Sequence, residues 1–481
     1  MKKNICILFM FLAVYLSAFS NNQWEDAISQ INEKSLPLVN IDVDVSSLTN
    51  ANYINGKITI YDYENRVDGN KYNTFDCKIR YRGASSLLYE KKSFAIKLID
   101  SEGEDLDANF FEIRKENDWI LDAMAVDRIR MRNRVCFDIW NEISKTPYDT
   151  DFENRNGTKG EFVEVYINGE YHGLYCMTDK IDRKLLGLKK AKENNDGSVN
   201  IRGLLYKGSA WTVATELGGY DASKSFDEET WNGWELQYPD DYPCYDAWKP
   251  LMDLIDFCNT DINYFKENYR KHFYYDNLVD YALFIMGNNI IDNLMKNTHL
   301  SCLDININDI FLITPWDLDC SLGGLYEGSH YEEYTKITNL TGNYLFYQMY
   351  MYNVDNFRES MKERWQELSL GIMSPDNFNA RLDAYAKRFK ESGAWQREYD
   401  KWNNNPVPLD LDEELEYVKK WYVNNIAALN KVLGVIADDI PYVFQDTDSY
   451  NIRMYNIDGK KIMSNPTGRR IYIENGRKII R

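Results

Sequence analysis

Four polar residues between positions 292 and 319 have the types and spacing that metal-assisted phosphoryl transfer requires. Asn297 follows Asp292 by five positions, and Asp317 and Asp319 follow Asn297 by twenty and twenty-two. Transfer of a phosphoryl group from a nucleotide needs a carboxylate that orients the acceptor, and an Asn and an Asp that hold Mg²⁺. The residues between Asn297 and Asp317 have the pattern of two strands, and a hairpin would bring the ends of this segment together. The spacing therefore favours a phosphoryl-transfer site.

A small-residue loop nearer the N-terminus would complete such a site. The sequence RGASS at 82–86 lies between two predicted strands, where backbone N–H groups could approach phosphates. The sequence FAIKL then places Lys97 on the next strand, in the manner of V-A-I-K in protein kinases, with Lys92 as the second choice. Each feature alone has an ordinary explanation, such as a hairpin turn or a solvated Lys. Their joint order favours the site.

The elements that must position these residues follow one another in a definite order. Alternating apolar and polar residues predict a strand-rich region at about 36–180, with a hairpin turned at Asn168-Gly169 and a helical segment that begins near Asp118. Residues 183–245 are rich in Gly, Asn and Asp and are predicted to form an irregular insertion. Helical patterns then dominate the chain around the hairpin of the candidate site.

The final helical pattern begins after Asp410, a predicted N-cap, and ends near residue 435. Short strands separated by Asp-Gly and Asn-Gly turns follow at 436–481 and predict a small all-β tail module. The whole order predicts an α+β protein with an atypical two-lobed, protein-kinase-like fold. The N-lobe would span about 36–180 and the C-lobe about 246–435.

The composition excludes several functional classes. The net charge of −19 argues against nucleic acid, because phosphate-binding surfaces need clustered Lys and Arg. The eight Cys are scattered, without a CxxC pair, and predict neither a disulfide framework nor a zinc ribbon. Only four His are present, so a bound metal is expected to be a hard cation held by carboxylates and Asn.

The N-terminus has the pattern of a secretory signal peptide over residues 1–20. Lys2 and Lys3 precede an apolar run from Ile5 to Leu16, and Ala18-Phe19-Ser20 provides small residues for cleavage. An uncleaved anchor helix is the alternative interpretation. No later segment has eighteen consecutive apolar residues, so no membrane span is predicted. An exported protein is therefore expected.

Several motifs together resemble the CotH family of spore-coat protein H kinases. The resembling pieces include IRYRGASSLLYEKKSFAIKL, DWILDAMAVDRIRMRNRV, VEVYINGEYHGLYCMTDKIDR, WELQYPDD, IDNLMKNTHL, PWDLDCSLGG and EYVKKWYVNN, within about residues 75–435. The resemblance implies a reduced kinase fold for residues 21–435. It also implies phosphorylation of Ser on exported proteins, dependent on ATP and on Mg²⁺ or Mn²⁺. The acceptor protein is not identified by the sequence.

The resemblance also implies roles for individual residues. Asp292 would be the catalytic carboxylate, assisted by Lys97, and Asp317 the principal metal ligand, supported by Asp319 and Asn297. The residues expected to contact the nucleotide are Arg82, Gly83, Ser85, Ser86, Lys92, Met177 and Asp179. Arg132 and Asn133 match an Arg-Asn pair that recurs on the first helix of the family.

The tail resembles the C-terminal sorting domain of the type IX secretion system of Bacteroidetes. The similar pieces are YNIDGKKI, GRRIYI and NGRKII. This resemblance implies that the tail is a receptor-read address, that the secretion machinery is a partner, and that the protein is secreted or displayed on the outer membrane. A small terminal β-module packed on the main domain is the alternative.

The sequence thus predicts a secreted or surface protein serine kinase. A non-catalytic surface module for adhesion, or for binding glycans or proteins, is the main alternative, because motif residues show capacity rather than use. A glycosidase with paired carboxylates is a third hypothesis. The acids are predicted to lie near a Lys and a small-residue loop, and that arrangement favours the kinase.

Overall fold

The structure is a computed structural model that describes residues 23–148 and 155–435, together with four short strands between residues 454 and 480. The predicted signal peptide lies outside the described residues. Within the described part, no helix combines the length and the apolar character needed to cross a bilayer.

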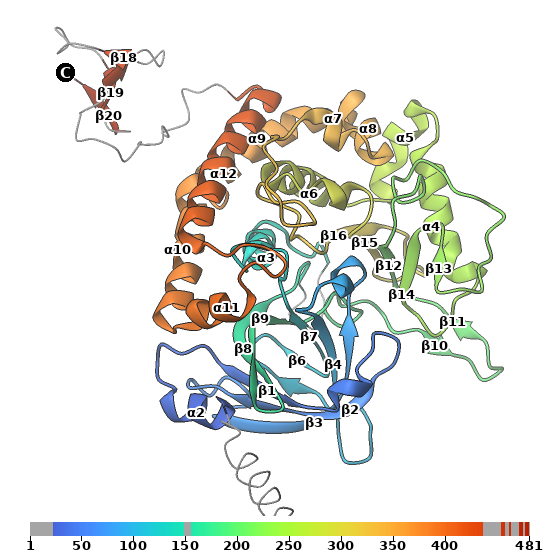
Figure 1. The fold of residues 1–481 in the computed structure, drawn as a ribbon. Helices are drawn as coiled ribbons and strands as arrows, with labels where there is room; N and C mark the ends of the chain where they lie inside the picture. Colours follow the sequence, from blue (N-terminus) through green and yellow to red (C-terminus); the bar gives the residue numbers. More distant parts are fainter. Residues whose placement is uncertain are drawn as a thin grey trace, which may run out of the picture.

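The first part of the chain closes into a seven-stranded β-barrel (Figure 1). Around the barrel the strands are β1 (Leu38–Asp42), β2 (Ile54–Tyr61), β3 (Tyr72–Arg82), β4 (Ser93–Ile99), β7 (Asp118–Asp122), β9 (Glu170–Thr178) and β8 (Gly160–Ile167). Strand β1 pairs in parallel with β8, and the other neighbours are antiparallel. Phe94, Ile96 and Leu98 of β4 fill the interior, so Ala95 and Lys97 take the outer face.

The barrel corrects one predicted boundary. Asp118–Asp122 is strand β7, where the start of a helix was predicted, and helix α3 begins only at Arg132 and ends at Ile143. The side chain of Asp127 accepts hydrogen bonds from the backbone N–H groups of Met131 and Arg132, both at 2.7 Å, and so caps this helix. The predicted hairpin turned at Asn168-Gly169 is confirmed as β8–β9.

A second, five-stranded sheet carries the hairpin of the candidate site. Its order is β13 (Thr230–Trp231), β14 (Trp234–Tyr238), β12 (Leu204–Gly208), β15 (Thr298–Cys302) and β16 (Phe311–Pro315). The predicted hairpin β15–β16 is confirmed. Residues 183–245, predicted to be an irregular insertion, instead supply three strands of this sheet, and β12 pairs directly with β15. Two short pairs complete the sheets: β5 (Ala108–Asn109) with β6 (Lys115–Glu116), and β10 (Lys192–Glu193) with β11 (Val199–Asn200).

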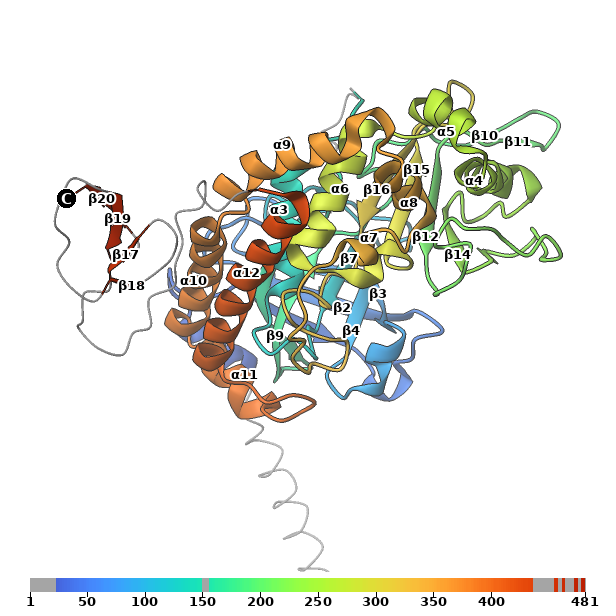
Figure 2. The same ribbon diagram turned by 90° about the horizontal axis from the view of Figure 1, so that it is seen from above.

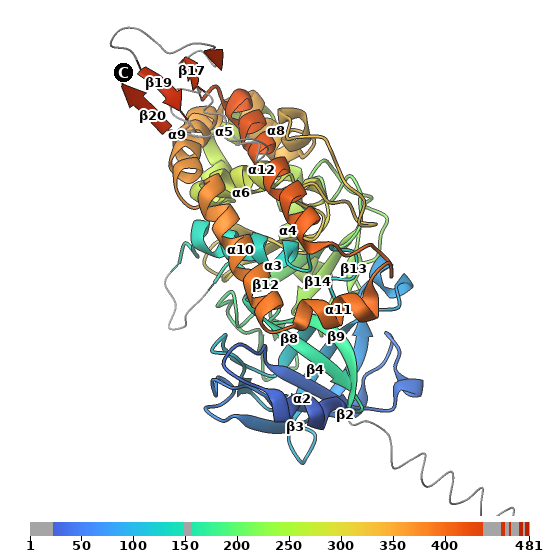
Figure 3. The same ribbon diagram turned by 60° about the vertical axis from the view of Figure 1, so that its left-hand side comes forward.

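Helices form the rest of the molecule. They are α2 (Gln23–Gln30), α4 (Tyr245–Cys258), α5 (Ile262–Asn268), α6 (Tyr275–Asn288), α7 (Ile337–Leu340), α8 (Tyr344–Met351), α9 (Phe357–Leu370), α10 (Pro375–Glu391), α11 (Ala394–Trp402) and α12 (Leu411–Leu433). Helices α10 and α12 run side by side (Figure 2). The barrel lies at one end of the molecule and α6, α9 and α12 at the other (Figure 3). The α+β class predicted from the sequence is confirmed.

Local capping explains where the last long helix begins. The Asp410 side chain accepts a hydrogen bond from Glu413 N at 3.1 Å, which confirms the predicted N-cap of α12. The helix ends at Gly434, which has a left-handed φ of 64°. Four strands lie within the predicted tail module: β17 (Met454–Asn456), β18 (Lys461–Ile462), β19 (Ile471–Glu474) and β20 (Arg477–Ile480).

Candidate functional site

One end of the β15–β16 hairpin brings Asn297 and Asp317 together. Thr298 pairs with Pro315, and Trp316 N donates to Asn297 O at 2.8 Å. Asn297 and Asp317 both have left-handed backbone conformations, with φ of 56° and 57°. Such conformations are uncommon outside glycine and occur often at functional sites. The two predicted metal ligands therefore lie at the same end of the hairpin, with Asp317 one residue beyond the partner of Asn297.

Asp292 lies on the loop that leads into this hairpin. It belongs to the 3₁₀ helix η4 (Ile291–Leu294), which connects α6 to β15. The Asp292 carbonyl accepts from the backbone N–H groups of Met295 and Lys296, and the Lys296 ammonium lies 3.2 Å from the Asp292 carboxylate. The predicted catalytic carboxylate thus begins a tight loop that ends at Asn297.

The carboxylates of Asp317 and Asp319 lack cationic partners. Asp317 is exposed to solvent and Asp319 is half-buried, yet neither forms an ion pair with a Lys or Arg of the described residues. Burial, followed by repulsion from Asp317 and Asp122, raises the pKa of Asp319 well above its usual range. Burial also raises the pKa of Asp317. Asp317 also lines a cavity between the barrel and the hairpin, which we call the cleft.

A third carboxylate, missed by sequence reasoning, faces this pair from the barrel. Asp122 ends strand β7 and accepts a hydrogen bond from the Asn133 amide at 2.9 Å. The Asn133 side-chain oxygen accepts in turn from Leu318 N at 3.1 Å, so this one side chain connects the barrel to the segment 317–319. The prediction of a helix near Asp118 hid the position of Asp122 on a strand end.

Three cations surround the acidic group without pairing with it. Arg82, Lys207 and Lys296 lower the pKa of Asp317 and so oppose the larger effect of burial. The Arg82 guanidinium lies 5.6 Å from the centre of the Trp316 ring. Lys207 belongs to β12, in the segment predicted to be an insertion, and so was missed. These residues could attract phosphate groups to the cleft.

The predicted phosphate loop lies beside the acidic group. Gly83 has a φ of 122°, and a Cβ there would come within 2.0 Å of Ser86 Oγ, so a side chain does not fit. Ser85 begins a 3₁₀ turn, η2 (Ser85–Leu88), and is exposed. The pKa of the Tyr89 hydroxyl is raised by burial and then by Glu327 and Asp319, which indicates that this end of the loop faces the acids.

Lys92 and Lys97 are placed differently from the prediction. The Lys92 ammonium donates to the carbonyls of Leu87 at 2.9 Å and Tyr89 at 2.6 Å, so it closes the loop. The Lys97 side chain is 39% exposed and lies 3.9 Å from Asp118. Ser93, not Lys97, pairs with Arg82 across the strands. Four residues of strand separate Lys97 from Ser93, roughly 13 Å at 3.3 Å per residue.

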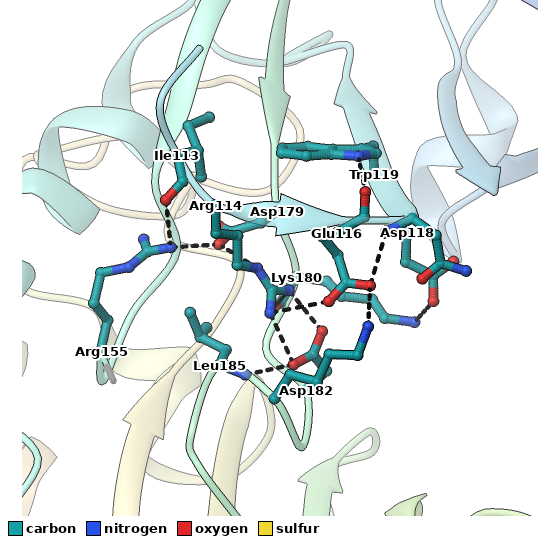
Figure 4. A network of polar contacts seen from close by, with 12 residues as sticks. Ile113, Arg114, Glu116, Asp118, Trp119, Arg155, Asp179, Lys180, Asp182 and Leu185 are labelled. Atoms are coloured by element: carbon teal, nitrogen blue, oxygen red, sulfur yellow. Dashed lines mark hydrogen bonds and ion pairs between the residues drawn. The ribbon is translucent and has the colours of Figure 1, made fainter. Parts of the chain in front are cut away.

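The side chains of Met177 and Asp179, two of the predicted nucleotide contacts, are both buried. The Met177 side chain is buried inside the barrel, whereas its neighbours Cys176 and Thr178 take the outer face. Asp179 is fully buried in a network of ion pairs (Figure 4), where Arg155 lies at 2.7 Å and Arg114 at 3.1 Å. Its other oxygen accepts from Lys159 N at 2.9 Å. The Asp179 carboxylate therefore stabilises the fold through its contacts with Arg114, Arg155 and Lys159 N.

A cavity separates the barrel from the hairpin and has an apolar part and an acidic part. The volume of the cavity is about 40 Å³. The Arg82 guanidinium, which lies over the Trp316 ring, occupies space beside the cavity. It is lined mainly by Arg82, Ile120, Asp122, Asn133, Phe137, Cys176, Thr178, Trp316 and Asp317.

The donor set fits a hard divalent cation that shares its coordination with phosphate. In the described part of the chain, no three acidic, His or Cys side chains are placed to hold one ion together. The carboxylate pair and the Asn297 amide are oxygen donors, and Mg²⁺ is commonly bound by one or two carboxylates with substrate phosphates and waters. The unpaired carboxylates with raised pKa values match that requirement.

Comparison with known proteins identifies similar chains. The model of a family described as CotH kinase protein matches residues 79–429, a range that includes every predicted site residue. Inner spore coat protein H of Bacillus subtilis (strain 168) is 22% identical over 249 residues, which cover 52% of this chain and 59% of that protein. The matched part thus spans somewhat more than half the length of this relative.

Proposed function

The chain belongs to the CotH kinase protein family, and on that premise we propose that it is a protein kinase, with a reduced two-lobed kinase fold, that phosphorylates Ser on exported proteins. The observation that carries the proposal is the pair of carboxylates Asp317 and Asp319, which form no ion pair within the described residues and which, together with Asp292, add to the effect of burial in raising the pKa of the Cys320 thiol. Such a pair costs stability unless a ligand supplies positive charge.

Asp292 acts on the acceptor. Its carboxylate orients the Ser hydroxyl and accepts its proton while the Ser oxygen forms a bond to the γ-phosphorus of ATP. The bond between the γ-phosphorus and the bridging oxygen breaks, and ADP leaves with that oxygen. The Lys296 ammonium, 3.2 Å from the Asp292 carboxylate, holds that carboxylate in place. Most of the rate comes from positioning and electrostatics.

The cleft binds ATP between the barrel and the hairpin. Asp317, Asp319 and Asn297 would hold Mg²⁺ or Mn²⁺, which when bound neutralises charge on the phosphates. The loop at 83–86 offers backbone N–H groups to those phosphates, and Arg82 leaves the Trp316 ring to reach them. The adenine then takes the apolar part of the cavity, beside Ile120 and Thr178.

The ends of the chain fit export. The predicted signal peptide and the sorting-like tail support a protein that is secreted or held at the outer surface, with the type IX machinery as a transient partner. The Bacillus relative is a spore coat protein by name, which supports a location at a surface.

Transfer of labelled phosphate tests the proposal. The full chain is incubated with γ-labelled ATP and Mg²⁺ or Mn²⁺, alone and with acidic and basic acceptor proteins. We expect labelling that falls by about 10²- to 10⁴-fold in Asp292→Ala, the contribution typical of a positioned acid–base group. Asp317→Ala should lose metal-dependent nucleotide binding.

Asp309→Ala is the matched control. Asp309 lies on the same hairpin, at the far end from the site, and contacts His272 at 3.3 Å. Its labelling should equal that of the wild type. No labelling and no thermal shift with ATP in the wild type would contradict the proposal and favour a non-catalytic binding module.

A further inference from the structure

The buried amide of Asn293 bonds both strands of the β15–β16 hairpin at the end that carries the predicted metal ligands. The Asn293 side chain is 1% exposed. Its nitrogen donates to Asn297 O at 2.6 Å and to Trp316 O at 2.8 Å. The first acceptor belongs to a predicted metal ligand, and the second belongs to the residue directly before Asp317. A single amide group therefore uses both of its protons on the two strand ends of the site.

The backbone at these two points needs such support. Asn297 and Asp317 both have φ values in the left-handed region. A non-glycine residue keeps this conformation only when its surroundings determine it. The hydrogen bond to Asn297 O fixes the peptide plane that follows Asn297, and the bond to Trp316 O fixes the plane that precedes Asp317. These two peptide planes adjoin the Cα atoms of Asn297 and Asp317, so they set the direction in which each metal-ligating side chain leaves the backbone.

A side chain of helix α6 in turn holds the backbone of Asn293 in place. The Tyr281 hydroxyl, on α6, donates to Asn293 O at 2.6 Å and lies 2.7 Å from Thr298 Oγ1. Tyr281 is buried, and Thr298 is the first residue of β15. The positions of Asp292, Asn293 and the hairpin are thus linked through one polar network that begins on α6. A polar network of this kind keeps a site rigid when its donors are all used.

We propose that Asn293 is a positioning residue for the metal–nucleotide site, which it supports by holding Asn297 and Asp317 in their left-handed conformations. The proposal rests on the proposed kinase function. It assigns to Asn293 no contact with ATP or with the acceptor. Partners that orient metal ligands typically change metal affinity or activity by about 10- to 100-fold when they are removed.

Asn277 provides a matched control on the same hairpin. It is also a buried Asn, 5% exposed, and it also makes two hydrogen bonds to the hairpin backbone. Its nitrogen donates to Ile313 O at 3.1 Å and its oxygen accepts from Ile313 N at 2.8 Å. Ile313 lies in the middle of β16, away from Asp317 along the strand. Loss of Asn277 should lower stability without moving the metal ligands.

The experiment measures the affinity of the full chain for Mn²⁺ in the presence of a non-hydrolysable ATP analogue, by calorimetry or by the resonance signal of free Mn²⁺. Asn293→Asp keeps the shape of the side chain and removes both donor protons. We expect about 10-fold weaker Mn²⁺ binding in Asn293→Asp and in Asn293→Ala. Asn277→Ala should keep the wild-type affinity although its melting temperature falls.

The outcomes separate the two proposals. Wild-type protein that binds no Mn²⁺–nucleotide would contradict the kinase function. Wild-type binding together with unchanged affinity in Asn293→Asp, or an equal loss in Asn277→Ala, would overturn the role of Asn293. If both Asn293 variants fail to fold, Tyr281→Phe takes their place, because it removes the hydroxyl that bonds Asn293 O and Thr298 Oγ1 and leaves the Asn293 amide intact. A weakening of a few-fold is expected there, and unchanged affinity would again overturn the role.

Discussion

Two groups of charged side chains near the cleft are built in opposite ways. In the first, Glu398 of α11 accepts hydrogen bonds from Lys91 at 2.6 Å, from Arg130 at 2.7 Å and from Leu174 N at 2.7 Å. All three charged side chains have no exposed surface. Burial would raise the pKa of Glu398, but its two cations lower it overall. We call this group the compensated cluster.

In the second group, Asp122, Asp317 and Asp319 face one another without a paired cation. Burial and then the like charges of Asp317 and Asp122 raise the pKa of Asp319, whereas burial raises the pKa of Asp317 against the opposing effect of Arg82. The compensated cluster joins the barrel, the residues before α3, and helix α11, and it needs no ligand. The acidic group is unfavourable without a ligand. The difference indicates that the compensated cluster stabilises the fold and that the acidic group is suited to bind a cation.

Removing the acid of the compensated cluster should have the largest effect on stability. In Glu398→Ala, Lys91 and Arg130 remain buried without their carboxylate. Breaking a buried ion pair from one side costs about 3 to 5 kcal/mol. Urea unfolding should therefore show a loss of that size, or a chain that does not fold at all.

Asp412→Ala is the control for that loss. Asp412 pairs with Lys390 on the surface, and its side chain is 79% exposed. Exposed pairs contribute little, so the free energy of unfolding should stay within about 0.5 kcal/mol of the wild type. Similar losses in the two variants would show that the compensated cluster does not support the fold as described.

Removing one acid from the second group should have a smaller effect of opposite sign. Asp319→Asn deletes a charge that Asp317 and Asp122 repel. We expect the metal-free protein to gain about 1 to 2 kcal/mol, the range seen when a functional residue opposes stability. The rise in melting temperature that Mg²⁺ and ATP give the wild type should disappear. A less stable metal-free variant would contradict the interpretation of this group.

The comparison also separates what the sequence can predict from what it cannot. The hairpin at Asn168-Gly169, the hairpin that leads to Asp317, and the N-cap Asp410 depend on neighbouring residues, and local patterns predicted them. The FAIKL pattern also placed Lys97 on the strand that follows the small-residue loop. The pattern did not predict which residue of β4 lies opposite Arg82, because the closed barrel fixes the strand register.

Residues that act over long sequence separations gave no local signal. Glu398 lies 307 positions from Lys91, and Lys207 enters the site through a strand in a Gly- and Asn-rich segment. Asp179 directly follows strand β9, yet Arg114 and Arg155 surround it from other parts of the chain. The spacing of Asp292, Asn297 and Asp317 was informative because a single hairpin connects them.

Lys91→Met should change the pH dependence of stability, and this change is the smallest of the effects compared, separate from any constant loss caused by the missing ion pair. Burial is the main cause that lowers the pKa of Lys91 in the folded chain, to about 7, and Arg130 adds to it, whereas Glu398 opposes both. The unfolded chain has a Lys pKa of about 10.4. Between these values the unfolded chain holds a proton that the folded chain has released, so stability rises with pH.

Lys91→Met has no ammonium group at this position, so its stability should lack the part of the rise with pH that Lys91 causes. Between pH 7 and pH 8 the wild type should gain about 0.5 to 1 kcal/mol relative to Lys91→Met, because one proton contributes at most about 1.4 kcal/mol per pH unit. Urea unfolding of both proteins at the two pH values measures the difference and cancels groups that titrate equally in both. Parallel pH profiles would mean that Lys91 stays charged beside Glu398. The compensated cluster would then carry a fixed extra positive charge, and its contrast with the acidic group would be sharper still.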